Sequence, residues 1–463
     1  MLWITVMKLR AVMYLRKITG YASLVILSAC TTYTPIKLPT KVSMPQSPDA
    51  IVVQPAQLPF DSLHKHIFNP ADGFDSDELA MLAVANNPQL RQTRDSLGVV
   101  RAQAFAAGLL PDPQLGITAD HPTNGGVGTM NAFNYNLSYD LNALLLRSSR
   151  KNVANFDTER INMELLWQEW QVVSQTKLLF TRITAQDALM QQLQAARNLW
   201  MQRYQASQHA MIAGNVTLDF ASADFVALQN TDRQINELER NLVQNRASLN
   251  SLLGLAATAQ VALVGEAHPL TLDAPAIFAN IENRLITRPD LQALKSGYES
   301  QEEKYRGAVL AQFPALNVGV TRARDTAGLY TMGFGLSLSL PIFNRNRGNI
   351  AIEQATRKKL LNEYQNRLNS AHSEIALAVE NLPLLQKQLQ HTKQGVEALQ
   401  KLAQRADEAY QAGNLAAPDY VRLQIGLLDK KTEAINLDEA LMEQRIALET
   451  LLGPDLPELR SSK

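Results

Sequence analysis

Residues 132–142 read AFNYNLSYDLN, and residues 330–340 read YTMGFGLSLSL. In both stretches every second residue is apolar, and those between are Asn, Ser, Gly, Thr or Asp with few exceptions. A period of two places the two sets of side chains on opposite faces of a β-strand. The pattern fits either a half-buried strand of a soluble antiparallel sheet or a strand that crosses a membrane, so the rest of the chain must decide.

Two more alternating stretches lie at residues 113–120 and 314–322. Each is followed, after a polar or glycine-rich turn, by one of the first two stretches. The apolar faces carry aromatic residues, and the polar faces carry almost no charge. Strands of about eleven residues are long enough to cross an outer membrane. This composition fits lipid on one face and water on the other.

Composition limits the classes of function. The 463 residues include 44 Lys and Arg against 44 Asp and Glu, and 46% of them are hydrophobic. A balanced charge gives no sign of nucleic-acid binding. Beyond the N-terminus no run of about 18 apolar residues occurs, so we expect no transmembrane helix in the mature chain. Any membrane crossing must therefore be made by strands.

The N-terminus resembles a bacterial lipoprotein signal. Arg16 and Lys17 precede an apolar stretch that ends in Leu27-Ser28-Ala29-Cys30. In such signals the cysteine is lipidated and becomes the first mature residue, so residues 1–29 are the predicted signal peptide. Cys30 is also the only cysteine, which excludes an intramolecular disulfide. The alternatives are a coincidental cysteine in an ordinary signal peptide and, separately, a start at Met13 rather than Met1.

The chain is a tandem duplication. Asn87-Pro88-Gln89-Leu90 recurs 201 residues later as Arg288-Pro289-Asp290-Leu291, and Leu252-Leu253-Gly254 recurs 199 residues later as Leu451-Leu452-Gly453. Such self-similarity defines repeat boundaries. The predicted parts are a lipid-anchored extended segment (30–72), a first repeat (73–255), a linker (256–285), a second repeat (286–454) and a tail (455–463).

Long helices with a heptad period are predicted between the strands and the repeat ends. Apolar residues recur in steps of three and four at Leu361, Tyr364, Leu368, Ala371, Ile375, Ala378, Leu382, Leu385, Leu389, Val396, Leu399, Ala403, Ala406 and Tyr410, with Thr392 as the one exception. Heptads predict a left-handed supercoil. A helix of about 65 residues is roughly 100 Å long, and Pro383 is a candidate kink. A self-contained coiled coil would explain the heptads but not the strands.

These features in this order resemble the outer membrane efflux protein family, the TolC-like outer membrane factors. The resemblance implies a mainly α protein with a small membrane β part. In that fold four transmembrane strands per subunit close one β-barrel in a homotrimer, and a long α-helical coiled-coil barrel continues it across the periplasm. Four strands cannot close a barrel alone, since about eight are needed. The joint at residues 340–350 is similar to that of the heavy-metal efflux branch.

The resemblance implies an exit duct in the cell outer membrane. Such a duct passively carries substrates expelled by an inner-membrane transporter, with a periplasmic adaptor protein as the third component. A duct for secreted polypeptides, as in type I secretion, and a lipid-anchored coiled-coil scaffold without a pore stay open as alternatives. A wide pore lined by Asn, Ser and Thr selects weakly, so the substrate is not predicted.

The hairpin tips are the candidate gate. Ala213-Gly214-Asn215 recurs as Ala412-Gly413-Asn414. In the family, a Tyr and acidic rings close the periplasmic end, and the resemblance assigns these roles to Tyr410 and Asp419 beside the tip glycine Gly413. Leu415 and Arg422 depart from the family pattern, and Arg422 is the candidate hydrogen-bond donor to Asp419. The alternative is that Tyr410 ends the seam and Asp419 is an acid favoured by the helix dipole.

No catalytic, cofactor or metal site is predicted. The seven His are scattered, and no His, Asp or Glu spacing on one helix face suggests metal ligands. No nucleophile elbow or Gly-rich phosphate loop occurs. The sequence therefore indicates a protein that is not an enzyme.

We expect acyl labelling of the mature chain at Cys30. Cys30→Ala should abolish it, because the thiol is the only acceptor that the signal offers. Mass spectrometry of the mature N-terminus checks this, and an unmodified terminus or cleavage at another residue would show that the lipoprotein interpretation is wrong.

Overall fold

A computed structural model describes residues 33–54, 58–64, 66–124, 126, 128–265 and 281–454. The signal peptide, Cys30, the tail and residues 266–280 of the predicted linker lie outside this part of the chain. Residues up to Met44 and residues from Pro45 onward form two separate units. Within the first, residues 33–44 contain no helix or strand. No described helix combines the length and apolar composition that a bilayer span requires.

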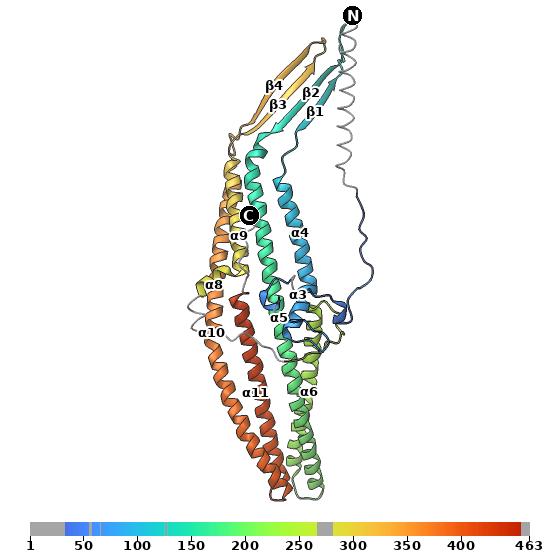
Figure 1. Cartoon of the computed structure of the whole chain (residues 1–463), viewed down its shortest axis with the longest axis vertical. Coiled ribbons are helices and arrows are strands. Elements are labelled where there is room, and N and C mark those ends of the chain that lie inside the picture. The colour runs from blue at the N-terminus through green and yellow to red at the C-terminus, as the bar shows by residue number, and fades with distance from the viewer. Residues whose placement is uncertain are drawn as a thin grey trace. The chain divides into compact units, whose positions relative to one another are not determined.

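The second unit consists of two repeats with the same order of elements (Figure 1). Short helices precede them: η1 (Pro48–Ala50), α2 (Asp61–His64) and α3 (Ser76–Asn86) before the first, and α8 (Ile281–Thr287) before the second. The first repeat contains α4 (Pro88–Gly108), β1 (Gln114–Asp120), β2 (Ala132–Asp140), α5 (Leu141–Ile212) and α6 (Leu218–Leu252). The second contains α9 (Pro289–Leu310), β3 (Ala315–Arg324), β4 (Tyr330–Ser339), α10 (Arg347–Gln411) and α11 (Ala417–Leu452). The predicted duplication is thus visible element by element.

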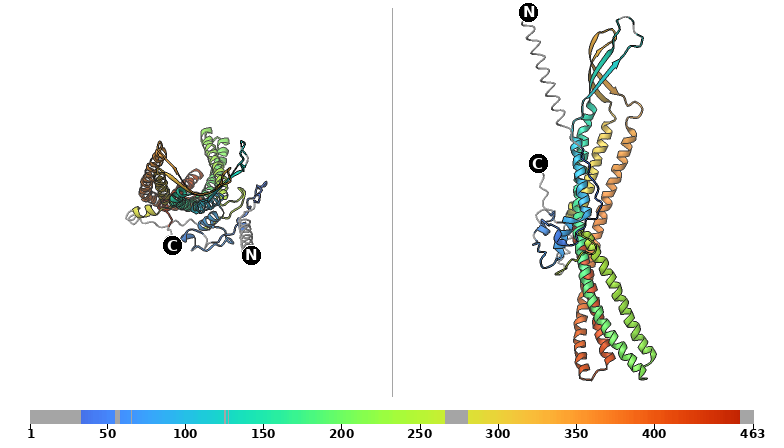
Figure 2. Two further views of the ribbon diagram at one scale, coloured as in Figure 1. Left: turned by 90° about the horizontal axis from the view of Figure 1, so that it is seen from above. Right: turned by 90° about the vertical axis from the view of Figure 1, so that its right-hand side faces the viewer.

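The four strands form one antiparallel sheet in the order β1-β2-β3-β4. The sheet lies at one end of the long helices, and the turns between α5 and α6 and between α10 and α11 lie at the other (Figures 1 and 2). The strand pair of each repeat therefore sits at the opposite end of the unit from its hairpin tip.

The strand boundaries differ from the predicted ones at the helix joints. The alternation in sequence extends to Asn142, but β2 ends at Asp140. The Asp140 side chain accepts hydrogen bonds from the backbone of Asn142 and Ala143 at 2.9 and 3.2 Å, which makes it the N-cap of α5. Residues 141 and 142 are therefore helical. At the other end of the sheet β3 continues to Arg324, beyond the predicted end at 322.

The second joint is built differently. Between β4 and α10, Arg345 and Asn346 both have positive φ, at 46° and 53°. A non-glycine residue rarely adopts this conformation. The side-chain amide nitrogen of Asn346 donates to the backbone oxygen of Ala308 near the end of α9, 2.8 Å away, and holds the joint. The chain therefore enters α5 directly from a strand but enters α10 through a sharp turn.

The heptad seam of α10 is confirmed over its middle. The helix has 65 residues, about 98 Å at 1.5 Å per residue, and runs through Pro383 without interruption. The fully buried seam residues are Ala371, Ile375, Ala378, Leu382, Leu389, Ala403 and Ala406. Thr392 is also buried, and its hydroxyl donates to Glu433 of α11 at 3.0 Å. Leu361 and Tyr410, at the two ends, are exposed.

In each repeat the residue that precedes α4 or α9 binds a carbonyl group at the end of the second hairpin helix, α6 or α11. In the first repeat the side-chain amide of Asn87, the N-cap of α4, donates to the Leu252 oxygen at the end of α6 at 2.9 Å. In the second, Arg288 stands before α9 and donates to the Leu451 oxygen at the end of α11 at 2.7 Å. These are the positions that recur in sequence. The last carbonyl groups of a helix lack partners within the helix, so each repeat supplies one from outside.

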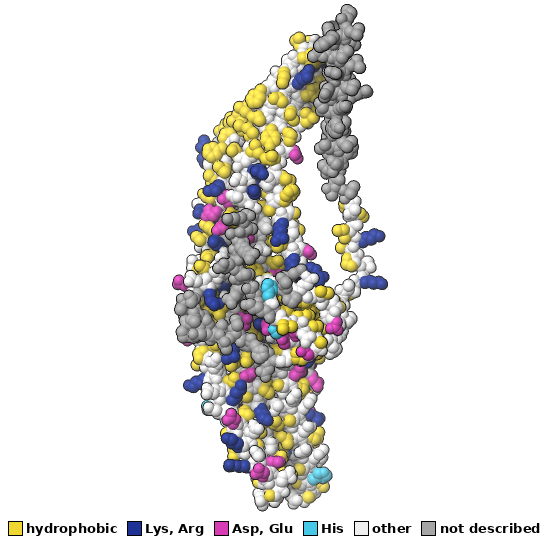
Figure 3. All heavy atoms as spheres, viewed as in Figure 1, with side chains coloured by type: hydrophobic (Ala, Val, Ile, Leu, Met, Phe, Trp, Pro, Cys, Tyr) yellow, Lys and Arg dark blue, Asp and Glu magenta, His cyan; other side chains and the backbone are white. Residues whose placement is uncertain are grey.

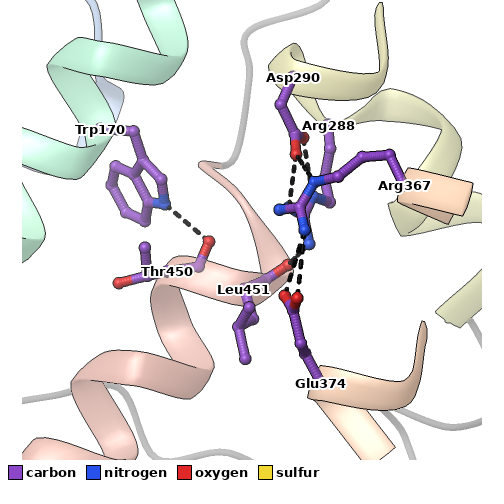
Figure 4. Close-up of polar contacts among 7 residues, drawn as sticks. All are labelled: Trp170, Arg288, Asp290, Arg367, Glu374, Thr450 and Leu451. Atoms are coloured by element: carbon purple, nitrogen blue, oxygen red, sulfur yellow. Dashed lines mark hydrogen bonds and ion pairs between the residues drawn. The ribbon is translucent and has the colours of Figure 1, made fainter. Parts of the chain in front are cut away.

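Arg288 is the centre of a buried ionic cluster (Figure 4). Its guanidinium binds both carboxylate oxygens of Asp290, at 3.0 and 2.8 Å, and lies 4.9 Å from the centre of the Trp167 ring. Arg367 of α10 binds Asp290 at 2.8 Å and also Glu374. Burial disfavours ionisation of Asp290, but the hydrogen bonds and charges of the two arginines outweigh it and lower its pKa.

The two repeats are joined along α5. Trp170 of α5 donates to the Thr450 oxygen of α11 at 3.2 Å, as Figure 4 shows. Lys177 of α5 lies 3.0 Å from Asp77 of α3 and 3.6 Å from Glu449 of α11. Burial opposes its positive charge, yet these two carboxylates raise its pKa. The middle of α5 therefore connects the second repeat to the segment that precedes the first.

We expect Arg288→Ala to lower the free energy of unfolding by about 3 kcal/mol, because it leaves a buried carboxylate and the Leu451 oxygen short of donors. Urea denaturation followed by far-UV circular dichroism measures this. Arg101→Ala, which removes an exposed arginine of α4, is the control and should change stability little. Equal stability of both variants would show that the cluster does not stabilise the fold.

Candidate channel wall and hairpin tips

One face of the sheet is largely apolar across the four strands. Directly paired residues of antiparallel strands share a face. Leu137 pairs with Leu115 on one side and Val320 on the other, and Val320 pairs with Phe334. This face contains Leu115, Ile117, Ala119, Phe133, Tyr135, Leu137, Tyr139, Leu316, Val318, Val320, Tyr330, Met332, Phe334, Leu336 and Leu338. The register confirms that the alternating patterns of the separate strands coincide.

The opposite face is polar and lightly charged. Asn136 pairs with Gly116 and Thr321, and Ser138 pairs with Gln114 and Gly319. On the strands, carboxylates occur on this face only at Asp120 and Asp140, the last residues of β1 and β2. A sheet with one largely apolar face and one polar face of few charges suits a wall between lipid and water.

The apolar face is largely exposed within this chain. Phe334 is 74% exposed and Met332 is 83% exposed. In Figure 3 hydrophobic side chains predominate over the strands, whereas charged side chains are spread over the helices. An exposed apolar surface of this extent marks an interaction site. No described part of the chain covers it.

The sheet has two open edges. Neither β1 nor β4 pairs with a further strand on its outer side within the described residues. Every residue of both strands is exposed. Open edges present unpaired backbone groups, which lipid cannot satisfy. The wall is therefore incomplete in a single chain.

One finding departs from the expected wall. Two arginines of β3 fall on the apolar face, Arg322 at the predicted end of the strand and Arg324 in its extension. Arg322 pairs with Tyr135 and Met332, and Arg324 pairs with Phe133 and Tyr330. Both lie next to the β3–β4 turn, at the end of the sheet that is remote from the helices.

The two hairpin tips have the same backbone. Gly214 and Gly413 have φ of 76° and 75°, and space around both is open, so the backbone angle rather than crowding requires glycine. The next residue donates to a carbonyl of the helix it follows, Asn215 to Ala210 and Asn414 to Ala409, each at 2.8 Å. These bonds are typical of a glycine C-cap. The recurring Ala-Gly-Asn therefore ends both long helices in the same way.

The predicted gate residues lie around the second tip. Arg422 donates to Asp419 at 2.8 Å within one turn of α11, and their side chains are 74% and 48% exposed. Tyr410 lies across the turn on α10 and is 40% exposed. The geometry thus gives Asp419 an intrachain donor, as the sequence suggested, and leaves Tyr410 accessible.

The structure adds Tyr420 to this group. Its ring stacks on that of Tyr410, with centroids 4.7 Å apart and planes at 9°. Partial burial, followed by a hydrogen bond to Asp407, raises the pKa of Tyr420. The sequence contains a signal for this pair, since Tyr410 and Tyr420 are equally distant from Leu415 in the turn. The pairing depends on how the two helices pack, however, and was not predicted.

The first tip has different side-chain contacts. Asp224 of α6 is almost fully buried and lies 2.7 Å from Arg203 of α5. The Arg203 guanidinium also lies over the rings of Trp200 and Phe220, 5.4 and 5.7 Å from their centres. The Arg203–Asp224 pair was not predicted from the sequence. A cation and a carboxylate 21 positions apart give no periodic signal.

A cavity of about 350 Å³ lies between the two tips. It is lined by Arg203, Phe220 and Asp224 from the first hairpin and by Tyr410, Tyr420 and Val421 from the second, among others. Both hairpins therefore contribute aromatic rings to the lining of this cavity. Among the described residues no group of three or more His, Cys, Asp or Glu side chains could hold a metal ion.

Comparison with known proteins agrees with this geometry. Residues 280–454 match the family model described as outer membrane efflux protein. The chain is 22% identical to the probable outer membrane lipoprotein SilC of Salmonella typhimurium, over 95% of this chain and 99% of that protein. It is 24% identical to the cation efflux system protein CusC of Escherichia coli K12, over 80% and 84%. The Campylobacter jejuni CmeC outer membrane channel has the same fold, with a TM-score of 0.70 at 16% identity, covering 93% of this chain and 96% of that one.

We expect the two faces of the sheet to tolerate charge differently. Leu137→Arg, on the apolar face, should cost roughly 2–4 kcal/mol near the middle of a bilayer, whereas Ser138→Arg should cost little. Leu336→Arg and Ser337→Arg form a second matched pair on β4. The yield of assembled protein in outer-membrane fractions measures the difference. Equal tolerance within both pairs would mean that the sheet is not in a membrane.

Proposed function

The chain belongs to the outer membrane efflux protein family, and we propose that it is the outer-membrane exit duct of a tripartite efflux pump. The observation that carries the proposal is the sheet register. It gives a four-stranded wall with one largely apolar face, one polar face with few charges and two open edges, set at the end of helices of 65 and 72 residues. Such a wall can form a water-filled barrel only when several copies of the chain join their sheets.

The duct is a homotrimer in this proposal. In three copies, β4 of one subunit pairs with β1 of the next, which satisfies both open edges and gives twelve strands, within the range of outer-membrane barrels. The polar face then lines the lumen, and the long helices continue the wall into the periplasm. Lipidation at Cys30 adds an anchor in the same membrane.

Transport through the duct is passive. The described residues contain no candidate metal centre, and the sequence has no phosphate-binding loop that would indicate nucleotide hydrolysis. Energy and direction come from an inner-membrane transporter, reached through a periplasmic adaptor at the hairpin tips. The names of SilC and CusC place those relatives in the outer membrane and in cation efflux, and they favour a metal-cation system as the setting for this chain.

Single-channel recording in planar bilayers tests the duct. The purified full-length protein should give discrete conductance steps because its polar face encloses water. A lipid-anchored scaffold without a pore, the alternative from another class, would give none. Deletion of the gene separates the two kinds of duct: loss of resistance to expelled small solutes supports efflux, and loss of a secreted polypeptide supports type I secretion.

We further propose that the second hairpin tip is the gate, formed by Tyr410, Gly413, Asp419 and Arg422. The tip is the end of α10 and α11 remote from the sheet, and its polar and aromatic groups are accessible. Around a threefold axis Asp419 occurs three times, so its like charges repel unless donors such as Arg422 compensate. The stack of Tyr410 on Tyr420 holds the two helices together at the same level.

Tyr410→Ala combined with Asp419→Ala should raise the open probability of the channel. The double variant removes the stack and the ion pair, which are together worth about 1–2 kcal/mol per subunit. In this proposal both contacts favour the closed arrangement. Single-channel recording measures the effect. Tyr305→Phe with Asp95→Ala, on α9 and α4, is the control. If the tip variant gives the same recordings as the parent, the gate proposal is wrong, and Tyr410 is only the last residue of the seam and Asp419 only an acid at a helix start.

A further inference from the structure

Two arginines interrupt the apolar face of the sheet at its outer end. Arg322 and Arg324 are the last alternate residues of β3, and the turn that follows is the part of the hairpin remote from the helices. Their paired neighbours are Tyr135, Met332, Phe133 and Tyr330, so both lie among large apolar and aromatic side chains. If the helices extend into the periplasm, this end of the sheet faces the outer leaflet.

The arginines have no carboxylate partner among the described residues. Arg324 donates to the Asn131 oxygen at 2.8 Å and lies 4.9 Å from the centre of the Phe133 ring, while its Nε is buried without a hydrogen bond. Arg322 makes no ion pair or hydrogen bond with any described residue. The adjacent Asp325 is engaged in the turn, where one oxygen accepts from the backbone of Ala327 and Leu329 at 2.9 Å.

The duplication does not explain these charges. The positions 201 residues earlier hold His121 and Thr123, beyond the end of β1. The first repeat therefore has no arginine at the positions that correspond to Arg322 and Arg324. Arg322 and Arg324 are specific to the second repeat, and a trimer would place three such pairs around the barrel.

The physics of the membrane decides where such cations are tolerated. An arginine on the lipid face costs about 2–4 kcal/mol at the middle of the bilayer but only about 0–1 kcal/mol near the interface. Its long side chain can reach the headgroups while its apolar part stays in contact with rings. Two guanidinium groups without carboxylates can then bind an anion of the headgroup layer, and a guanidinium fork matches a phosphate with two parallel hydrogen bonds.

We propose that Arg322 and Arg324 form a binding site for the phosphate of an anionic lipid in the outer leaflet. A cavity of about 170 Å³ on this surface is lined by Arg322, Ala323, Arg324, Phe133, Tyr135 and Tyr330. It offers guanidinium groups for the phosphate and aromatic rings for the adjoining apolar part of the lipid. The site rests on the proposed function, because it requires this end of the sheet to lie in the outer leaflet.

Lipid binding to the purified full-length protein tests the site. The probes are diphosphorylated lipid A and the same lipid after chemical removal of its phosphates, titrated in detergent and followed by native mass spectrometry. The parent should prefer the phosphorylated form, and Arg322→Gln with Arg324→Gln should lose that preference. Each charge-assisted bond contributes roughly tenfold in affinity. Arg101→Gln with Arg240→Gln removes two exposed arginines of α4 and α6 and should bind like the parent.

Three results would overturn the inference: equal binding of the two lipids by the parent, an unchanged preference in the double variant, or the same loss in the control. If the double variant does not assemble, Arg322→Gln and Arg324→Gln are measured singly. If both single variants bind like the parent, the inference is likewise overturned. A parent protein that conducts in planar bilayers but shows no phosphate preference rejects the lipid site alone. A protein that neither conducts nor reaches the outer membrane rejects the proposed function instead.

Discussion

The unpaired backbone at the two edges of the sheet is the constraint on which the rest of the molecule depends. The outer sides of β1 and β4 carry donors and acceptors that no described segment satisfies. In water these groups would be solvated, but in lipid each would cost several kcal/mol. A single chain is thus a stable wall segment only beside other copies. The same geometry positions the helices, since Asp140 ends β2 and caps α5 without an intervening loop.

The duplication supplies a repeated way of fixing helix ends, with different chemistry in each copy. Asn87 and Arg288 occupy equivalent positions and bind equivalent carbonyl groups, those of Leu252 and Leu451. A neutral amide suffices in the first repeat. The second uses a buried cation, whose charge Asp290 compensates. Asp290 also binds Arg367 of α10. A cation at a helix C-terminus is favoured by the helix dipole, so the substitution strengthens the contact at the cost of burying charge.

The two tips share a backbone but differ in how firmly their side chains hold them. The first tip has a buried Arg203–Asp224 pair flanked by rings, whereas the second has the exposed Asp419–Arg422 pair and the Tyr410–Tyr420 stack. Exposed ion pairs stabilise little because water screens them. The ion pair at the second tip therefore adds little to the stability of that hairpin.

The sequence by itself determined the features that depend on local periodicity. Alternation around Leu137 and Ser138 gave the strands and their faces, steps of three and four around Ile375 and Leu382 gave the long helices, and the recurring glycines gave the tips. These patterns can be read within one element because side-chain direction follows backbone geometry. At β2 the alternation extends beyond the strand, because Asp140 caps the next helix and a local hydrogen bond ends the strand before its pattern ends.

Only the tertiary structure decided which distant residues meet. The Arg288–Leu451 bond, the Tyr410–Tyr420 stack and the Arg203–Asp224 pair each join separate helices. The extension of β3 to Arg324, which depends on pairing with β2 and β4, placed a second cation beside Arg322 on the apolar face. Such contacts are set by the register in which elements pack. That register minimises the free energy of many interactions at once, so no single stretch of sequence encodes it.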